Sequence, residues 1–172
     1  MSNGRSRVES PPVKGRVSDT ASKGGTTIFV VHGHDRVRKE QLITFLEQVT
    51  TRTVAVLDRK AFLGRTLMEK FEQNAARAAY AVVLLTADDE GRPVGSKRWR
   101  RRARQNVMFE LGYFYGAIGR SRVAVLYERG VQLPSDMKGV GWLALDIKGS
   151  WKAKLAKELR HAKIDVDLNK AV

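Results

Sequence analysis

The sequence predicts a single α/β domain, built as a five-stranded parallel sheet with helices on both faces. Three observations support this prediction. Runs of six or seven mostly apolar, often β-branched residues occur five times along the chain. Amphipathic helical patterns lie between most of these runs, an alternation typical of a parallel sheet. Because the runs are almost continuously apolar, we expect strands that are buried on both faces.

The first strand and helix begin abruptly after a polar segment. TTIFVVH (residues 26–32) is the first expected strand, and HGHD (residues 32–35) turns the chain into a helix. Asp35 has the side chain of a good helix cap, because its carboxylate can accept a hydrogen bond from the first turn. The apolar stripe that this helix would turn toward the sheet consists of Val37, Leu42, Phe45, Leu46 and Val49.

The second strand is expected over TVAVLD (residues 53–58), followed by the loop RKAFLGR. A helix over residues 66–78 comes next, with Leu67, Phe71, Asn74 and Ala78 in register on one side. YAVVLLT (residues 80–86) is the third strand and the most apolar one. Residues 87–104 form a long polar connection without periodicity, which is typical of a functional or mobile loop.

The last third of the domain repeats the same alternation. A helix over residues 104–119 precedes RVAVLYE (residues 122–128), the fourth expected strand. WLALDI (residues 142–147) is the fifth strand. SWKAKLAKELRHA (residues 150–162) has the pattern of a final amphipathic helix, and Ser150 is expected to cap it. Together these elements predict a wound sheet whose ligand site lies beyond the carboxyl ends of the strands.

Charge is unevenly distributed along the chain. Residues 1–25 consist largely of Ser, Gly, Pro and charged residues, so we expect a basic tail or linker followed by a domain over residues 26–172. The formal charge of +14 suggests nucleic acid as a partner. The tail contributes +3 and the segment from Lys97 to Arg104 six cations, which leaves only +5 for everything else. Nucleic acid is therefore not the expected partner, with a basic arm in the tail as the alternative.

Several classes of protein are disfavoured by composition. The chain has no cysteine, so disulfides and thiolate chemistry are excluded, and its three histidines make no convincing zinc site alone. No apolar run approaches the roughly 18 residues of a membrane span. The basic N-terminus lacks the apolar core of a secretory signal. We expect a cytoplasmic protein that binds neither a membrane nor a metal.

One carboxylate stands out in the helix RQNVMFELGYFYGAIG (residues 104–119). Val107, Leu111, Phe114 and Ile118 form its apolar face, and Glu110 lies at the edge of that face. A carboxylate held against apolar walls has a raised pKa and a strong field on nearby cations. The alternative is an ordinary exposed Glu on the rim of the helix.

Polar loops are expected to meet this helix at one edge of the sheet. HGHD places Gly33 where backbone can approach a ligand, and His34 or Asp35 could bind a ribose or a phosphate. Asp88 follows the third strand, and Arg104 lies at the start of the Glu110 helix. The alternative for HGHD is simply a helix entry, and the two interpretations are compatible.

KRWRRRAR (residues 97–104) allows three interpretations. It could bind nucleic acid, with Trp99 as a stacking aromatic. It could neutralise the diphosphate of a dinucleotide through its arginine forks, or be a solvated loop. A phospho-acceptor receiver is disfavoured, because His34 replaces the second acid and neither strand four nor strand five ends in Lys. The motifs GxGxxG and GxxxxGK[ST] are both absent.

Five motifs occur in order within residues 26–170. They are FVVHGHD, FLGRTLMEKFE, AVVLLTADDEG, RARQNVMFELGYFYGAIGRSRVAVLY and VQLPSDMKGVGW. Together they resemble the TIR-like family of bacterial predicted nucleotide-binding proteins, the effector domains of STING-linked and Pycsar anti-phage systems. The resemblance implies a flavodoxin-like TIR fold in which a Glu on the third helix supports cleavage of NAD+. Here Glu110 matches that position.

The resemblance also implies a substrate site and a mode of assembly. Residues 58–65 correspond to the TIR BB loop, with Phe62 and Arg65 facing substrate and the loop joining subunits into an oligomer or filament. Many catalytic TIR domains have an aromatic one turn before the Glu, where this chain has Asn106. Stacking on nicotinamide would then come from elsewhere, and the candidates are Trp99, Phe62 and Tyr113.

Three hypotheses follow. The first is an NAD+ glycohydrolase with Glu110 as its catalytic residue and NAD+ as substrate, needing no cofactor and active when self-associated, with a separate sensor protein as a possible partner. The second is a non-catalytic TIR-like module that binds a nucleotide or scaffolds a complex, which Asn106 favours. The third is a nucleic-acid binder that uses the tail and the Arg cluster.

Overall fold

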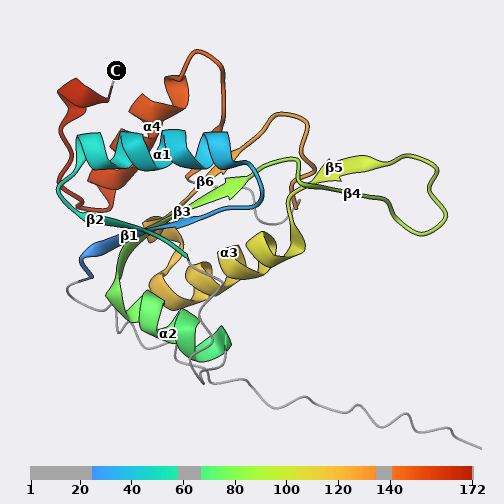
Figure 1. Ribbon diagram of the computed structural model, residues 1–172, viewed down its shortest axis with the longest axis horizontal. Coiled ribbons are helices and arrows are strands. Elements are labelled where there is room, and N and C mark those ends of the chain that lie inside the picture. Colours follow the sequence, from blue (N-terminus) through green and yellow to red (C-terminus); the bar gives the residue numbers. More distant parts are fainter. Residues whose placement is uncertain (1–24, 58–66, 135–140, 172) are drawn as a thin grey trace, which may run out of the picture.

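The computed structural model describes residues 25–57, 67–134 and 141–171. Five parallel strands form its central sheet in the order β2-β1-β3-β6-β7 (Figure 1). This flavodoxin-like arrangement confirms the predicted fold class. The strands are β1 (Thr27–Val31), β2 (Thr53–Val56), β3 (Ala78–Leu85), β6 (Val123–Tyr127) and β7 (Trp142–Ala144).

Helices cover both faces of the sheet. The α-helices of the described residues are α1 (Arg36–Val49), α2 (Leu67–Arg77), α3 (Gln105–Ile118) and α4 (Ser150–His161). Figure 1 shows α1 and α4 on one face and α2 and α3 on the other. Short 3-10 turns follow α3 (Arg120–Arg122) and close the described chain (Leu168–Lys170).

Two apolar cores result, one on each side of the sheet. Successive side chains of a strand point to opposite faces. In β1, Ile28 and Val30 therefore pack with α1 and α4, whereas Phe29 and Val31 pack with α3. All eight residues of β3 are buried, which explains why the sequence of this central strand is apolar without alternation.

The connection over residues 87–104 is not the irregular loop that the sequence predicts. Its strands β4 (Asp89–Gly91) and β5 (Arg100–Arg102) pair antiparallel as a hairpin that extends away from the sheet (Figure 1). The prediction was wrong because both strands are three residues long and mostly charged, so no alternation of apolar and polar residues marks them.

Two predicted helix details also differ from the structure. Val37 does not belong to the buried stripe of α1, because its side chain is 67% exposed. Ser150 does not cap α4. Asp146 does so from outside the helix, accepting hydrogen bonds from the backbone N–H groups of Ser150 and Trp151 at 3.1 and 3.2 Å. A carboxylate four residues upstream can satisfy these donors when the loop folds back onto the helix end.

The predicted ends of several elements lie a few residues from the observed ones. The second and fifth strands end two and three residues earlier than predicted, and β3 begins two residues earlier, so that Ala78 belongs to β3 rather than to α2. Within the described ranges, no helix combines the length and apolar character needed to cross a bilayer.

The strand order reverses between β1 and β3, the two central strands. β2 lies beyond β1 on one side, and β6 lies beyond β3 on the other. In open α/β sheets, ligands bind in a crevice formed by the loops outside the carboxyl ends of such strands. In this chain those loops are residues 32–35 after β1 and residues 86–88 after β3.

Candidate functional site

The loops after β1 and β3 touch at the reversal point. Gly33 is buried, and a Cβ atom at this position would lie 1.5 Å from Oδ2 of Asp88. Only glycine leaves room for that carboxylate. The hydroxyl of the buried Thr86 donates to Oδ1 of Asp88 at 3.0 Å, whereas Oδ2 is buried and has no hydrogen-bond partner among the described residues. Asp88 thus presents an unused acceptor oxygen at the point where the two loops meet.

A second contact ties the loop after β1 to the start of α3. The guanidinium of Arg104 contacts Nε2 of His34, although the two residues are 70 positions apart in sequence. Arg104 directly precedes α3, so the contact fixes the N-terminus of that helix against the β1–α1 loop. An imidazole and a guanidinium side by side at a helix N-terminus can bind an anionic group such as a phosphate.

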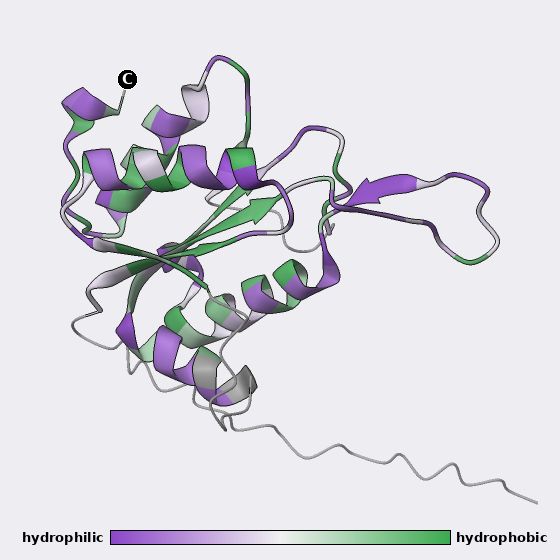
Figure 2. Cartoon of the chain, in the orientation of Figure 1, coloured by the Kyte–Doolittle hydropathy of each residue, from purple (hydrophilic) through white to green (hydrophobic). Residues whose placement is uncertain are grey.

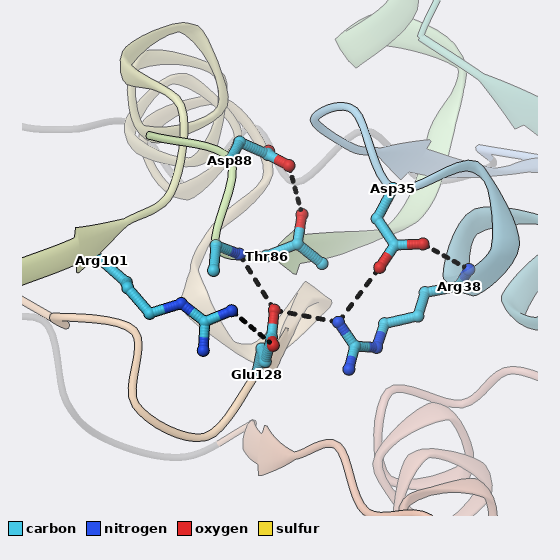
Figure 3. Close-up of polar contacts among 7 residues, drawn as sticks. Asp35, Arg38, Thr86, Asp88, Arg101 and Glu128 are labelled. Carbon is cyan, nitrogen blue, oxygen red and sulfur yellow. Dashed lines mark hydrogen bonds and ion pairs between the residues drawn. The ribbon is translucent and has the colours of Figure 1, made fainter. Parts of the chain in front are cut away.

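A cluster of charged residues links three strand ends and the base of the hairpin (Figure 3). Glu128, which follows β6, forms an ion pair with Arg38 at 2.9 Å and accepts a hydrogen bond from the backbone N–H of Ala87 at 3.0 Å. Arg101 of β5 contacts the same carboxylate at 3.4 Å. Arg38 also pairs with Asp35 at 3.0 Å. Because only 18% of the Glu128 side chain is exposed, these bonds are shielded from water and hold the loops in fixed relative positions.

Asp35 has the helix-capping role that the sequence predicts. Its Oδ1 accepts a hydrogen bond from the backbone N–H of Arg38 at 2.9 Å. The other carboxylate oxygen, Oδ2, pairs with the Arg38 guanidinium. With both oxygens engaged, Asp35 orients the loop after β1.

Glu110 lies in the middle of α3, on the face that packs against the sheet. Glu110 is only 2% exposed, and Val107, Leu111 and Phe114 of the same helix are fully buried. No other charged residue in the described part of the chain is buried to this degree. Taking a carboxylate out of water is costly unless the surroundings compensate, so a buried Glu is uncommon without a role.

Glu110 is the sixth residue of α3, so it lies about 8 Å along the axis from the helix start. That start is the end that Arg104 fixes to the loop after β1. Phe109, the preceding residue of the same helix, is 51% exposed, so burial at position 110 depends on the face of α3 that packs against the sheet.

The remaining candidate residues from the sequence lie in several other parts of the structure. Asn106 is exposed in the first turn of α3. Tyr113 is half-buried between α2 and α3, with its ring 5.1 Å from that of Phe71, and burial together with the nearby charge of Glu72 raises its pKa. Trp99 lies in the loop that joins β4 to β5, and Figure 1 shows this hairpin extending away from the body of the domain. Phe62 and Arg65 lie outside the described residues.

Sequence reasoning missed the charged cluster centred on Glu128. The available signal was its position directly after a buried parallel strand, where side chains reach the carboxyl edge of the sheet. Arg38 gave no such signal, because it is one of several charged residues in the helix α1. Among the described residues, no group of three or more His, Asp or Glu side chains is arranged to hold a metal ion.

A hollow of about 690 Å³ opens beside this region, between the base of the hairpin and the start of α3. Its lining combines apolar and polar side chains, including Arg102, Ala103, Gln105, Met108 and Leu133. None of the described residues that were predicted to bind substrate lines this hollow. The hollow therefore lies beside the loops after β1 and β3 and is not formed by them.

Comparison with known proteins identifies related chains. A sequence model described as the TIR domain of CAP12/Pycsar effector proteins matches residues 27–147. An Escherichia coli K12 protein, "Uncharacterized protein YuaY", is 41% identical over 145 residues, which cover 84% of this chain and 48% of the relative. "Protein tirC" of Dictyostelium discoideum is 29% identical over 67% of this chain and 62% of its own length.

A relative with a more informative name matches a shorter stretch. "Pycsar effector protein PaPycTIR" of Pseudomonas aeruginosa is 36% identical over 75 residues, which are 42% of this chain and 24% of that protein. The chain thus spans less than two thirds of the length of each of these relatives.

Proposed function

Because the chain belongs to the family of CAP12/Pycsar effector TIR domains, we propose that it hydrolyses NAD+ to nicotinamide and ADP-ribose, or forms a cyclic ADP-ribose. We propose that it does so in the cytoplasm, as an effector of anti-phage defence. The observation that carries the proposal is Glu110, a carboxylate buried to 98% on the helix that leads away from the crevice.

The chemistry needs an anion more than it needs an acid. When the N-glycosidic bond of NAD+ breaks, its electron pair leaves with nicotinamide, which becomes neutral, and the ribose carbon becomes cationic. In this proposal the carboxylate of Glu110 binds the ribose hydroxyls and stabilises that cation as it develops. A water molecule then bonds to the ribose carbon and releases a proton, which gives ADP-ribose. Attack by the adenine instead gives the cyclic product.

Groups around the crevice suit the rest of NAD+. Arg104 and His34 are proposed to bind the diphosphate, because a guanidinium matches two phosphate oxygens. The unused Oδ2 of Asp88 is proposed to accept a hydrogen bond from a ribose hydroxyl, which would give this oxygen the partner that it lacks. Gly33 lets the substrate approach the backbone, and Tyr113, Trp99 and Phe62 remain candidates for stacking on nicotinamide.

Burial of Glu110 bears on regulation. A carboxylate that is 2% exposed in the single chain cannot touch a substrate until neighbouring groups move. We propose that self-association through residues 58–65 supplies this change, so that the isolated chain is nearly inactive. A ligand or partner stabilises an active arrangement only if it binds that arrangement more tightly than the resting one.

Chromatography of NAD+ incubated with the purified protein tests the proposal. Turnover per chain should rise steeply with protein concentration and with a crowding agent, and nicotinamide should appear in step with NAD+ loss. If no nicotinamide forms even at the highest protein concentration, with or without the crowding agent, the glycohydrolase proposal is wrong.

The second candidate function is a non-catalytic TIR-like module that binds a nucleotide or scaffolds a complex. Asn106 favours it, because this exposed residue lies one turn before Glu110 and offers no ring to stack on nicotinamide. Calorimetric binding of NAD+ without any release of nicotinamide would support this second candidate.

A further inference from the structure

The tip of the β4–β5 hairpin carries a group of cations that the proposed NAD+ cleavage does not use. Figures 1 and 2 show the hairpin extending from the carboxyl edge of the sheet, away from all four helices, with mostly hydrophilic residues along it. Residues 91–100 form its tip. An arm of this kind buries little apolar surface against the domain, so folding alone does not explain its length.

Charge on the hairpin differs between its base and its tip. At the base, cations face acids across the two strands, with Asp89 opposite Arg102 and Glu90 opposite Arg101. The tip holds no carboxylate at all and carries four cations: Arg92, Lys97, Arg98 and Arg100. Within the described ranges, no acidic side chain forms an ion pair with any of these four. The tip therefore concentrates an uncompensated positive charge on one small surface.

An aromatic ring lies among these cations. Trp99 is 57% exposed, and the guanidinium carbon of Arg92 lies 4.7 Å from the centre of its ring system. This cation–π contact holds the indole on the hairpin and leaves much of its surface open to solvent. Exposed tryptophans are uncommon on soluble domains unless they contact a partner.

Local hydrogen bonds give the tip a definite shape. The backbone N–H of Ser96 donates to the carbonyl of Pro93 at 3.1 Å, which closes a turn. Gly95 supplies the positive φ of +82° that the third position of a type II turn requires. The hydroxyl of Ser96 then accepts from the backbone N–H of Arg98 at 3.2 Å. Because the turn positions Arg98 and Trp99, less freedom is lost when they bind a partner.

The base of the hairpin is fixed to the domain. Arg101 contacts Glu128, and Arg102 donates to Gln132 at 2.9 Å. The side chain of Arg102 also crosses Gly91 so closely that a Cβ atom there would lie 2.6 Å from it. These contacts use the two arginines that already face acids, and they leave the tip free for a partner.

We propose that the hairpin tip binds single-stranded nucleic acid, with Arg98, Arg100 and Lys97 on the phosphates and a base stacked on Trp99. Guanidinium forks suit phosphate oxygens, and an accessible indole offers a stacking surface to any base. The proposal departs from the expectation drawn from net charge, because four cations share one tip around an exposed ring. An anionic membrane is a weaker fit, since Val94 and Trp99 are the tip's only large exposed apolar residues.

Fluorescence anisotropy of a labelled oligothymidylate of about 15 nucleotides tests this proposal on the full chain. The test variant is Lys97→Gln/Arg98→Gln/Arg100→Gln. The matched control, Lys154→Gln/Lys157→Gln/Arg160→Gln, removes the same charge from exposed positions of α4. Each phosphate contact contributes about 0.7 to the slope of log affinity against log salt, so the tip variant should lose about two from that slope. The α4 variant should keep the wild-type slope.

Substitutions of Trp99 measure the contribution of stacking to binding separately from that of charge. Trp99→Ala should weaken binding about tenfold at fixed salt, the order of effect of one lost base stack, and Trp99→Phe should restore most of it. The proposal is overturned if Trp99→Ala binds the oligonucleotide like wild type, or if both triple variants weaken binding equally. It is also overturned if the tip variant binds like wild type, which is the result expected if residues 1–25 bind the oligonucleotide instead. It is also overturned if phosphatidylserine vesicles bind more tightly and with the same dependence on these residues.

Discussion

Replacing Gly33 by alanine tests the closest contact between the loops after β1 and β3. An added methyl group would lie 1.5 Å from Oδ2, 2.6 Å from Cγ and 3.2 Å from Oδ1 of Asp88. Favourable separations between non-bonded heavy atoms are about 3.5–4.0 Å. The Asp88 carboxylate must therefore leave its place in the variant, since no small adjustment relieves such an overlap.

The expected cost has two parts. Moving Asp88 breaks its hydrogen bond from Thr86, which is 3.0 Å long and contributes about 0.5–1.5 kcal/mol. Inserting a methyl group into a closely packed place costs about 1–3 kcal/mol in general, and less if a side chain can move aside. Because the Asp88 side chain can move aside, the second part should be about 1 kcal/mol, and we expect Gly33→Ala to lower the free energy of unfolding by about 1.5–2.5 kcal/mol. For a domain of this size that lowers the Tm by roughly 3–10 °C.

Urea unfolding followed by far-UV circular dichroism measures this cost in a double-mutant cycle with Asp88→Ala. In the Asp88→Ala background the overlap is gone, so Gly33→Ala should cost less than about 0.5 kcal/mol. Gly112→Ala is the control, because a Cβ at this exposed position of α3 meets nothing within 4 Å. It should stabilise the helix by about 0.5–1 kcal/mol. Equal costs of Gly33→Ala in both backgrounds would refute the reasoning.

Three further substitutions test other parts of the structure. Glu128→Ala removes the acceptor of two hydrogen bonds and the partner of the Arg38 ion pair, and it should cost about 2 kcal/mol in urea unfolding, whereas a loss below about 0.5 kcal/mol would show that the charged cluster is not stabilising. Leu155→Ala, at a fully buried position of α4, should cost about 2–5 kcal/mol in the same assay, and a near-neutral result would contradict the packing of α4 on the sheet. Asp146→Ala should lower the Tm at pH 7. Hydrogen bonds from Ser150 lower the pKa of Asp146 below its usual 3.8, so its contribution is complete above that pH and is lost as the pH falls below it. Melts at pH 7 and pH 3 should show the gap between wild type and Asp146→Ala closing, and an unchanged gap would remove the capping role.

The sheet could be predicted from sequence because burial on both faces leaves a strong local signal. All residues of β1 and β3 are buried, and both strands read as unbroken apolar runs. The helix that carries Glu110 was equally predictable, since Val107, Leu111 and Phe114 recur at helical spacing. The burial of Glu110 follows from that periodicity, because the same face of the helix packs against the sheet. Asp35 was predictable as a cap because capping depends on neighbours three residues away.

Features that depend on distant residues could not be predicted. The hairpin is one, because its strands are short, charged and held by a register that pairs Asp89 with Arg102. The cluster around Glu128 is another, since it joins residues from three separate loops. The sequence also placed Trp99 among the substrate-binding candidates. In the structure this residue lies on the hairpin tip, and whether it reaches the nicotinamide stays a prediction.

The rate of NAD+ loss in Glu110→Gln tests the central claim most directly. Glutamine keeps the shape of the side chain and removes its charge, so the variant should fold and lose turnover by at least about 100-fold, the order expected when a preorganised electrostatic group is removed. Glu72→Gln, at an exposed position of α2, is the matched control and should turn over like wild type. Equal rates in wild type and Glu110→Gln, measured by chromatography of nicotinamide at the same protein concentration, would contradict the account.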